Sequence, residues 1–144
     1  PGSFTGTRIT IAMARTLGQQ LGCQIDGISS FELIATRLSK NLKSNEIKNN
    51  FWITQKLKRR GIIAGQYKIL EKQGEEIIEI AEMKKPYLLE KEEKVYPALD
   101  AIEDVNQDIK VLIDKCLRYH IENKNSNPNF VLPIYPTSPV EIEK

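Results

Sequence analysis

The spacing of apolar residues changes along the chain, and each change marks a different kind of element. In the first 30 residues, small and apolar side chains recur at steps of three and four, which predicts a helix over residues 7–21. Thr5 or Thr7 is suited to cap this helix and Gly22 to end it. The positions that set the spacing are Ile11, Ala14, Leu17, Gly18 and Leu21. Residues 23–28 follow as a short apolar stretch that predicts a buried strand.

A second helix is predicted to begin after this strand. Ser29 and Glu32 stand in the register of a capping box. The inward face of the helix is formed by Phe31, Ile34, Ala35 and Leu38. A helix, a strand and a helix in this order indicate an α/β arrangement of layers.

The middle of the chain changes to the period of strands. A polar loop over residues 39–50 precedes three predicted strands, 51–57, 61–70 and 76–81, whose short turns indicate an antiparallel meander. Beyond a charged separator at residues 90–94, a long helix is predicted, because one apolar stripe continues over about six turns. The stripe comprises Leu99, Ile102, Val105, Ile109, Leu112, Ile113, Cys116, Leu117 and His120. Residues 131–136 are predicted to be extended, since prolines in this tail forbid a helix.

Composition places these elements in a globular protein of ordinary charge. The 144 residues are 40% hydrophobic and 28% charged, and 21 basic against 19 acidic residues leave a net charge of +2. This balance excludes an acidic solvating tail and does not suggest a protein that coats nucleic acid. No apolar run approaches the roughly 20 residues of a membrane helix. Cys23 and Cys116 lie in apolar patterns, which predicts small core residues in a protein of the reducing cytoplasm.

Catalytic and metal-binding patterns are weak. The Gly-rich opening over residues 1–6 leads into Thr7 and Arg8, so it lacks the Lys-Ser or Lys-Thr of a P-loop, and it is not a dinucleotide fingerprint. The single histidine, His120, fits a residue near a helix end better than a metal ligand. The carboxylates are spread over polar faces. No catalytic, cofactor-binding or metal-binding residue is therefore assigned.

One basic cluster has two interpretations. Four cations gather at the turn between the first two predicted strands, namely Lys56, Lys58, Arg59 and Arg60. They can contact RNA phosphates, with aromatic side chains nearby for stacking. They also fit a charged turn that keeps an edge strand soluble.

Three segments resemble one known family. Residues 1–9 read Pro-Gly-Ser-Phe-Thr-Gly-Thr-Arg-Ile, and they are followed by a small-residue helix and by Gly-Ile-Ser-Ser at residues 27–30. This order resembles the TsaB (YeaZ) family of bacterial tRNA threonylcarbamoyladenosine biosynthesis proteins. Residues 59–61 and 132–135 resemble its paired-arginine region and its C-terminal close, although Leu57 and Lys58 replace an Asp-Ala pair and residues 136–137 replace Leu-Arg. The likeness is thin over residues 71–124.

The resemblance implies an α/β, actin-like ATPase (ribonuclease H-like) fold in a catalytically silent version. It divides the chain into an incomplete N-terminal half-domain over residues 1–40 and a C-terminal half-domain with antiparallel hairpins, a long helix and an extended tail over residues 41–144. Family members carry strands before the Gly-rich motif, so we expect an N-terminally truncated chain. The helix over residues 7–21 is then expected to expose an apolar face that requires a partner.

The resemblance also implies a function and its partners. We expect a non-catalytic scaffold that pairs with a TsaD-like catalytic subunit and supports threonylcarbamoyl transfer to the tRNA adenosine beside the anticodon. A TsaE-like ATPase joins the assembly, a homodimer is possible, and tRNA is contacted indirectly. The interface falls on the two N-terminal helices, with Gly2, Ser3, Phe4, Thr5, Gly6, Arg8, Ala12 and Gly18 as the expected contact residues.

Two alternatives remain open at this point. One is a glycoprotease-like enzyme of the same superfamily, which needs an H-x-x-x-H pattern, whereas this chain has one histidine. The other is an RNA-binding module that uses the basic turn.

Overall fold

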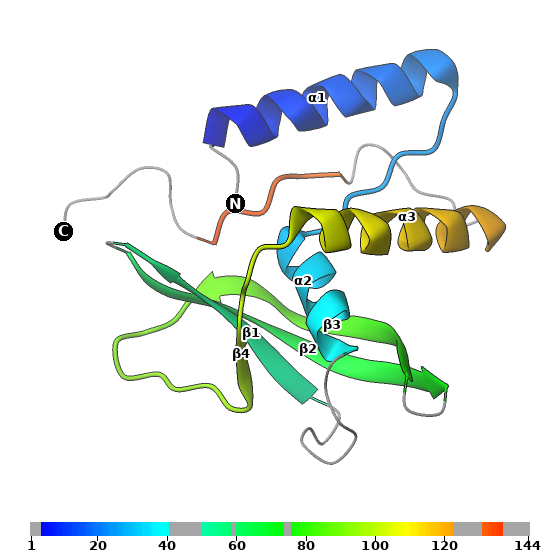
Figure 1. The fold of residues 1–144 in the computed structure, drawn as a ribbon. Coiled ribbons are helices and arrows are strands. Elements are labelled where there is room, and N and C mark those ends of the chain that lie inside the picture. Colours follow the sequence, from blue (N-terminus) through cyan, green and yellow to red (C-terminus); the bar gives the residue numbers. More distant parts are fainter. Residues whose placement is uncertain (1–3, 41–49, 59, 74–75, 123–130, 137–144) are drawn as a thin grey trace.

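The computed structural model describes residues 4–40, 50–58, 60–73, 76–122 and 131–136. Helices and strands follow one another along the chain as α1 (Phe4–Leu21), α2 (Ser30–Ser39), β1 (Asn50–Leu57), β2 (Gly61–Gln73), β3 (Glu76–Leu88), β4 (Ala98–Asp100) and α3 (Val105–Ile121). The strands form one sheet, α2 and α3 stack over one of its faces, and α1 lies farther out (Figure 1). The predicted mixed α/β class is confirmed.

The sheet has the strand order β3-β2-β1-β4. β1, β2 and β3 form the predicted antiparallel meander, although β3 continues to Leu88 and its pairing with β2 contains register shifts. β4 joins β1 in parallel, with Leu99 opposite Ile53. The apolar spacing assigns Leu99 and Ile102 to the long helix, and that prediction is wrong. The helix begins only at Val105, because the Asp104 carboxylate caps it by accepting from the Gln107 amide at 3.1 Å.

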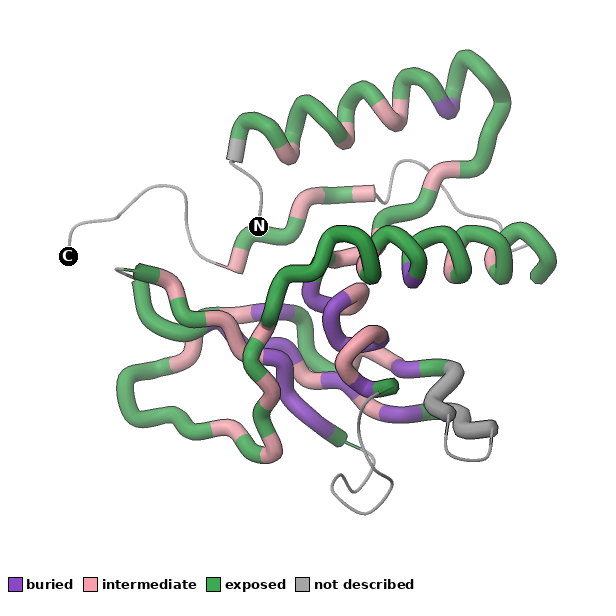
Figure 2. The backbone as a smooth tube through the Cα atoms, in the orientation of Figure 1, coloured by how far each residue is buried: buried purple, intermediate pink, exposed green. Residues whose placement is uncertain are grey.

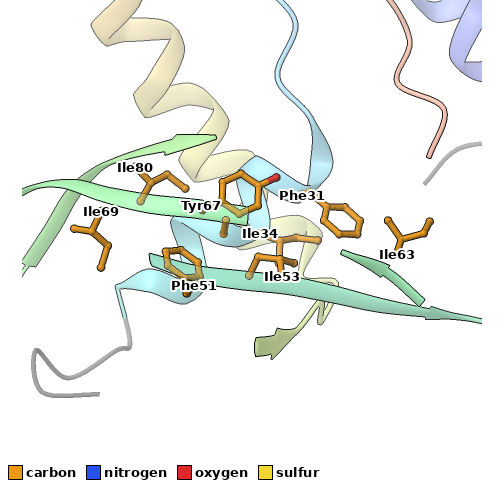
Figure 3. Packing of buried hydrophobic residues seen from close by; sticks show 9 residues of the cluster. Phe31, Ile34, Phe51, Ile53, Ile63, Tyr67, Ile69 and Ile80 are labelled. Carbon is orange, nitrogen blue, oxygen red and sulfur yellow. The ribbon is translucent and has the colours of Figure 1, made fainter. Parts of the chain in front are cut away.

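One buried cluster joins α2 to the inner face of the sheet (Figure 3). α2 contributes the predicted Phe31, Ile34 and Ala35 to the cluster. The strands contribute alternate residues, as the two-residue period requires: Phe51, Ile53, Ile63, Tyr67, Ile69 and Ile80. Burying one such side chain stabilises the fold by about 1.5–3 kcal/mol. The predicted division places α2 in the N-terminal half-domain. In the structure, α2 shares its core with the sheet, whose strands belong to the predicted C-terminal half-domain. The division itself stays a prediction.

α2 is capped at its start as the sequence predicts, but only half of the capping box forms. The Ser29 hydroxyl accepts a hydrogen bond from the Glu32 amide at 3.0 Å. The Glu32 carboxylate does not return to the cap. It pairs instead with the Lys115 ammonium on α3 at 2.6 Å. The Glu32 side chain, which the local pattern assigns to the cap, is thus engaged in a long-range ion pair.

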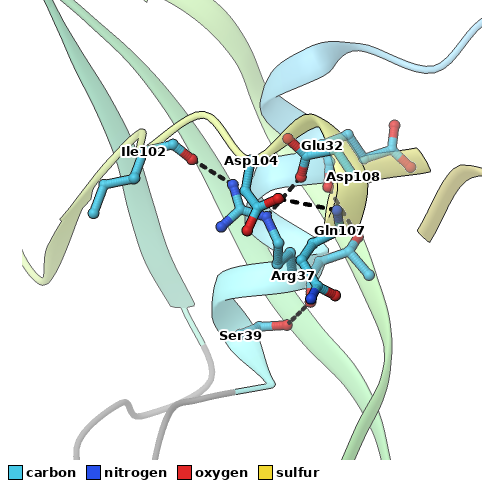
Figure 4. A network of polar contacts seen from close by, with 8 residues as sticks. Glu32, Arg37, Ser39, Ile102, Asp104, Gln107 and Asp108 are labelled. Atoms are coloured by element: carbon cyan, nitrogen blue, oxygen red, sulfur yellow. Dashed lines mark hydrogen bonds and ion pairs between the residues drawn. The ribbon is translucent and has the colours of Figure 1, made fainter. Parts of the chain in front are cut away.

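α3 is fixed on α2 through polar contacts (Figure 4). The Arg37 guanidinium donates to the Asp108 carboxylate at 2.7 Å and also to the Ile102 carbonyl. Val111 lies on the same face and is buried. Asp108, Val111 and Lys115 follow one another at steps of three and four, so this face packs on α2. The apolar stripe expected on this helix is left exposed, including Val105, Ile109, Leu112, Ile113 and Leu117.

α1 packs on extended segments and not on the sheet (Figures 1 and 2). Gly18 faces Ile25, and residues 131–135 line a hollow beside the helix. Residues 23–28 are extended, but they form no strand, so that prediction is wrong. No described strand pairs with them, and a strand needs a neighbour to satisfy its backbone groups. Residues 131–136 are extended, as their prolines predict.

Candidate partner interface

α1 begins earlier than the sequence suggests and ends where it predicts. The helix starts at Phe4, so Thr5 and Gly6 lie inside its first turn and not in a turn before it. Gly22 has a φ of 63°, a left-handed conformation that glycine adopts without a Cβ penalty. The Cys23 amide donates to the Gly18 carbonyl at 3.0 Å and closes the end of the helix. The C-terminal end of α1 is thus set by Gly22.

Threonines along α1 keep their hydroxyls within the helix. The Thr10 hydroxyl donates to the Gly6 carbonyl at 3.0 Å, and the Thr16 hydroxyl donates to the Ala12 carbonyl at 2.9 Å. A hydroxyl that bonds back by one turn shows less polarity to its surroundings. These bonds leave the exposed side of α1 more apolar than its composition suggests.

The outer face of α1 is an apolar stripe. Four large side chains follow at four-residue steps, and each is at least half exposed: Ile9, Met13, Leu17 and Leu21. Their spacing places them on one side of the helix over three turns. An apolar face of this helix is exposed, as expected, but it differs from the predicted one, because Gly18 is buried and Ile11 and Ala14 are half-buried. We call these four residues the α1 stripe.

The inner face of α1 carries the close contacts. Gly18 is buried, and a Cβ atom there would lie 2.3 Å from the Ile25 Cγ1 atom. Arg8 and Ala12 line the hollow that α1 forms with residues 131–135. Gly18, one of the residues predicted to contact a partner, therefore packs against the chain's own segment, whereas Arg8 and Ala12 are exposed at the edge of the hollow. A contact of these residues with a partner stays a prediction.

The remaining predicted interface residues surround the start of the helix. Gly2 and Ser3 lie outside the described residues, whereas Phe4, Thr5 and Gly6 form the first turn of α1. The structure adds Ile9 and Met13, which the sequence reasoning did not single out. Their four-residue step to Leu17 and Leu21 was the available signal.

A second exposed apolar surface lies on α3. Val105, Ile109 and Leu112 border a hollow of about 270 Å³ that continues to Leu33 and Ile34 of α2. The polar rim of this hollow includes Asp108, which Arg37 already pairs. The surface is apolar and open, but it carries no convergent set of charged groups that would define a ligand.

The basic turn is placed less favourably for RNA than its sequence suggests. Lys56, Lys58 and Arg60 are exposed, while Arg59 lies outside the described residues. Two of the neighbouring aromatic side chains, Phe51 and Tyr67, are fully buried in the core. Burial also raises the pKa of the Tyr67 hydroxyl. These rings have no exposed face on which a base could stack.

The turn that lies beside the basic turn is acidic, and its Glu93 side chain is already hydrogen-bonded. The Leu89 amide donates to the Ile62 carbonyl at 2.8 Å, which brings the turn over residues 90–93 beside the basic one. Glu93 in that turn accepts a hydrogen bond from the Tyr87 hydroxyl at 2.6 Å. Trp52 is buried, and the Lys84 ammonium lies 5.5 Å from its ring centroid. These neighbours favour the interpretation of a charged, solvated turn.

The other sequence candidates do not assemble into a site. Cys23 and Cys116 are both exposed, so their prediction as core residues is wrong. His120 is exposed in the last turn of α3. Among the residues that the structure describes, no group of three or more His, Cys, Asp or Glu side chains is placed to hold a metal ion. No described helix combines the length and the apolar character needed to cross a membrane.

Comparison with known proteins gives a structural likeness. No family model matches the sequence, and no curated protein matches it. A crystal structure described as an uncharacterized protein with similarity to peptidase YeaZ, from Pseudomonas aeruginosa, aligns with a TM-score of 0.62 at 16% identity, covering 95% of this chain and 70% of the other. The chain has a YeaZ-like fold. The structure of YeaZ from Pseudomonas aeruginosa is also similar, with a TM-score of 0.61 at 19% identity, covering 94% of this chain and 70% of the other.

Proposed function

We propose that this YeaZ-like protein is a non-catalytic subunit that supports threonylcarbamoyl transfer to tRNA by pairing with a TsaD-like subunit. The proposal includes an actin-like ATPase topology for the fold and membership of the TsaB family. The observation that carries it is the α1 stripe, an exposed row of four large apolar side chains on the helix that follows the Gly-rich motif. The YeaZ-like fold and the resemblance of residues 1–9 to the family's Gly-rich motif support the same choice.

The α1 stripe has the properties of a docking surface. The distance from Ile9 to Leu21 is twelve residues, which corresponds to about 18 Å along a helix axis. Exposed apolar rows of this kind fit a hydrophobic groove on a partner, in the manner of an amphipathic helix. Covering each side chain is worth on the order of 1–2 kcal/mol before the costs of association. The stripe is therefore large enough to determine whether a complex forms.

In this proposal, the charged side chains of α1 contribute to partner binding and have no catalytic role. α1 carries Arg8 and Arg15 and no acidic residue. We propose that a TsaE-like ATPase joins the same assembly, that tRNA is held by the partners, and that homodimers use the same stripe. The chain itself is assigned no catalytic residue.

The proposal is tested by co-purification. The chain and the TsaD-like subunit of the same organism are co-expressed, with an affinity tag on only one of them. A stable complex that restores the tRNA modification in a strain lacking the chain is the expected result. Absence of a complex, together with unchanged modification in the deletion strain, would overturn the proposal. Tight ATP binding with hydrolysis by the chain alone would instead favour the glycoprotease-like enzyme alternative.

A further inference from the structure

The two methionines of the chain are both exposed, but they lie on different surfaces. Met13 stands inside the α1 stripe, and 60% of its side chain is exposed. Met83 lies on β3 with 52% exposed. There the register shifts, because Glu82 pairs with Tyr67 and Lys84 with Gln66, so Met83 stands opposite no residue of β2. A dissolved oxidant can reach both thioethers, and only Met13 belongs to the α1 stripe.

Oxidation changes the chemistry of a methionine side chain without adding charge. Hydrogen peroxide transfers one oxygen atom to the thioether sulfur, which loses two electrons, while the O–O bond breaks and the second oxygen leaves as water. The product is a polar sulfoxide. Methionine sulfoxide reductases reverse the change, since the sulfoxide oxygen leaves as water while two enzyme thiols become a disulfide. The modification is therefore a reversible exchange of an apolar side chain for a polar one.

The surroundings of Met13 on α1 are unsuited to a sulfoxide. The residues one turn away, at steps of three and four, are Ile9, Thr10, Thr16 and Leu17. Ile9 and Leu17 are apolar, and the two threonine hydroxyls already donate to backbone carbonyls of the helix at 3.0 and 2.9 Å. These four side chains thus offer no donor to an oxygen atom on the Met13 sulfur. Such an oxygen relies on water for its hydrogen bonds.

We propose that Met13 is an oxidation-sensitive site that controls docking of the TsaD-like subunit on the α1 stripe. This inference rests on the proposed function, because it assigns a regulation to the same surface. In the free chain, water hydrates the sulfoxide and the fold is unaffected. In the complex, the partner excludes that water, and a buried acceptor without a donor is costly. The reduced thioether is apolar and flexible, so it packs in the same interface at no such cost.

The test compares the reduced chain with its oxidised form. The full chain is treated with hydrogen peroxide until mass spectrometry shows the Met13 sulfoxide, the peroxide is removed, and dithiothreitol reduces the exposed thiols of Cys23 and Cys116 without reducing sulfoxides. Calorimetry against the TsaD-like subunit is expected to show at least tenfold weaker binding after oxidation. We expect an unchanged melting temperature for the free chain and recovery of the affinity after treatment with methionine sulfoxide reductases.

Two leucine variants serve as matched controls. Met13→Leu conserves volume and apolar character, so it is expected to bind like the wild type and to keep its affinity after peroxide. Met83→Leu retains Met13 and is expected to lose affinity on oxidation as the wild type does. Equal affinity of the oxidised and reduced wild type, or an equal loss in oxidised Met13→Leu, overturns this inference and leaves the proposed function standing. Failure of the untreated chain to bind the partner overturns both.

Discussion

The Arg37 guanidinium on α2 lies 2.7 Å from the Asp108 carboxylate on α3, with only 13% and 17% of the two side chains exposed. This ion pair, together with Lys115 and Glu32, turns a largely polar face of α3 toward α2 and leaves the helix's apolar stripe exposed. A pair so far from solvent is stabilising only while both partners are present, because a single buried charge has lost its hydration.

The first prediction concerns this pair. Replacing Arg37 by Ala or Asp108 by Ala is expected to lower the free energy of unfolding by about 1–3 kcal/mol, because each change leaves the other charge unpaired. Urea denaturation of the two single variants and of the double variant measures the coupling. We expect the double variant to lose less than the sum of the two single losses. Strict additivity would contradict the role assigned to the pair.

The second prediction concerns Gly18. An alanine in a helix interior is normally about 1 kcal/mol more stable than a glycine. Here the added Cβ would lie 2.3 Å from Ile25 Cγ1 and 3.2 Å from the Cys23 carbonyl oxygen, so the gain should reverse. We expect Gly18→Ala to lower the melting temperature, and Ile25→Ala in the same chain to recover part of the loss. A higher melting temperature for Gly18→Ala alone would show that α1 does not pack closely on the segment after it.

The third prediction concerns Tyr87 and Glu93 at high and low pH. The hydrogen bond to the Glu93 carboxylate raises the pKa of Tyr87 from 10.0 to about 12, and the same bond lowers the pKa of Glu93. Through Tyr87, the hydrogen bond therefore stabilises the folded state fully below pH 10. This stabilisation is lost as the pH rises toward 12, where the Tyr87 hydroxyl ionises. Through Glu93, the same bond stabilises the folded state above the ordinary pKa of a glutamate. This stabilisation is lost as the pH falls through the lowered pKa of Glu93, where the carboxylate is protonated.

Tyrosine absorbance measures the first half of this behaviour. The difference between the titrations of the wild type and Tyr87→Phe isolates the Tyr87 phenol. We expect its midpoint near pH 12 in the wild type and closer to 10 in Glu93→Gln. An identical Tyr87 midpoint in both proteins would show that the hydrogen bond does not form.

The fourth prediction concerns the two cysteines. Cys23 and Cys116 are exposed, so both are expected to react with a thiol reagent in the native protein at rates near those of the unfolded chain. Cys23→Ser and Cys116→Ser assign the two signals. Protection of either thiol until the protein unfolds would return that residue to the core position that its sequence pattern indicated.

Local sequence patterns predict the parts of this fold that depend on neighbours in the chain. The Ser29 cap, the inward face of α2 and the meander of β1, β2 and β3 all follow from residue spacing and turn residues. Gly22 ends α1 for the same kind of reason, because its left-handed backbone is a local property.

The features that the sequence does not predict depend on residues far apart. Arg37 and Asp108 are 71 positions apart, and their contact determines which face of α3 is covered. The apolar pattern alone indicates the opposite face. Residues 23–28 have the composition of a strand, but strand formation also requires a paired neighbour. For the candidate interface, the exposed apolar helix could be anticipated, whereas the burial of Gly18 against Ile25 required the structure.

The central claim is that the α1 stripe is the surface on which the TsaD-like partner docks, and a binding titration of designed variants tests it most directly. Met13→Glu and Leu17→Glu place charges in the centre of the stripe, while Ile113→Glu places the same charge on the exposed apolar face of α3 as a matched control. Calorimetry against the purified partner is expected to show at least tenfold weaker binding for each α1 variant and wild-type affinity for the control. Wild-type affinity in both α1 variants, with binding lost only in Ile113→Glu, would contradict the account.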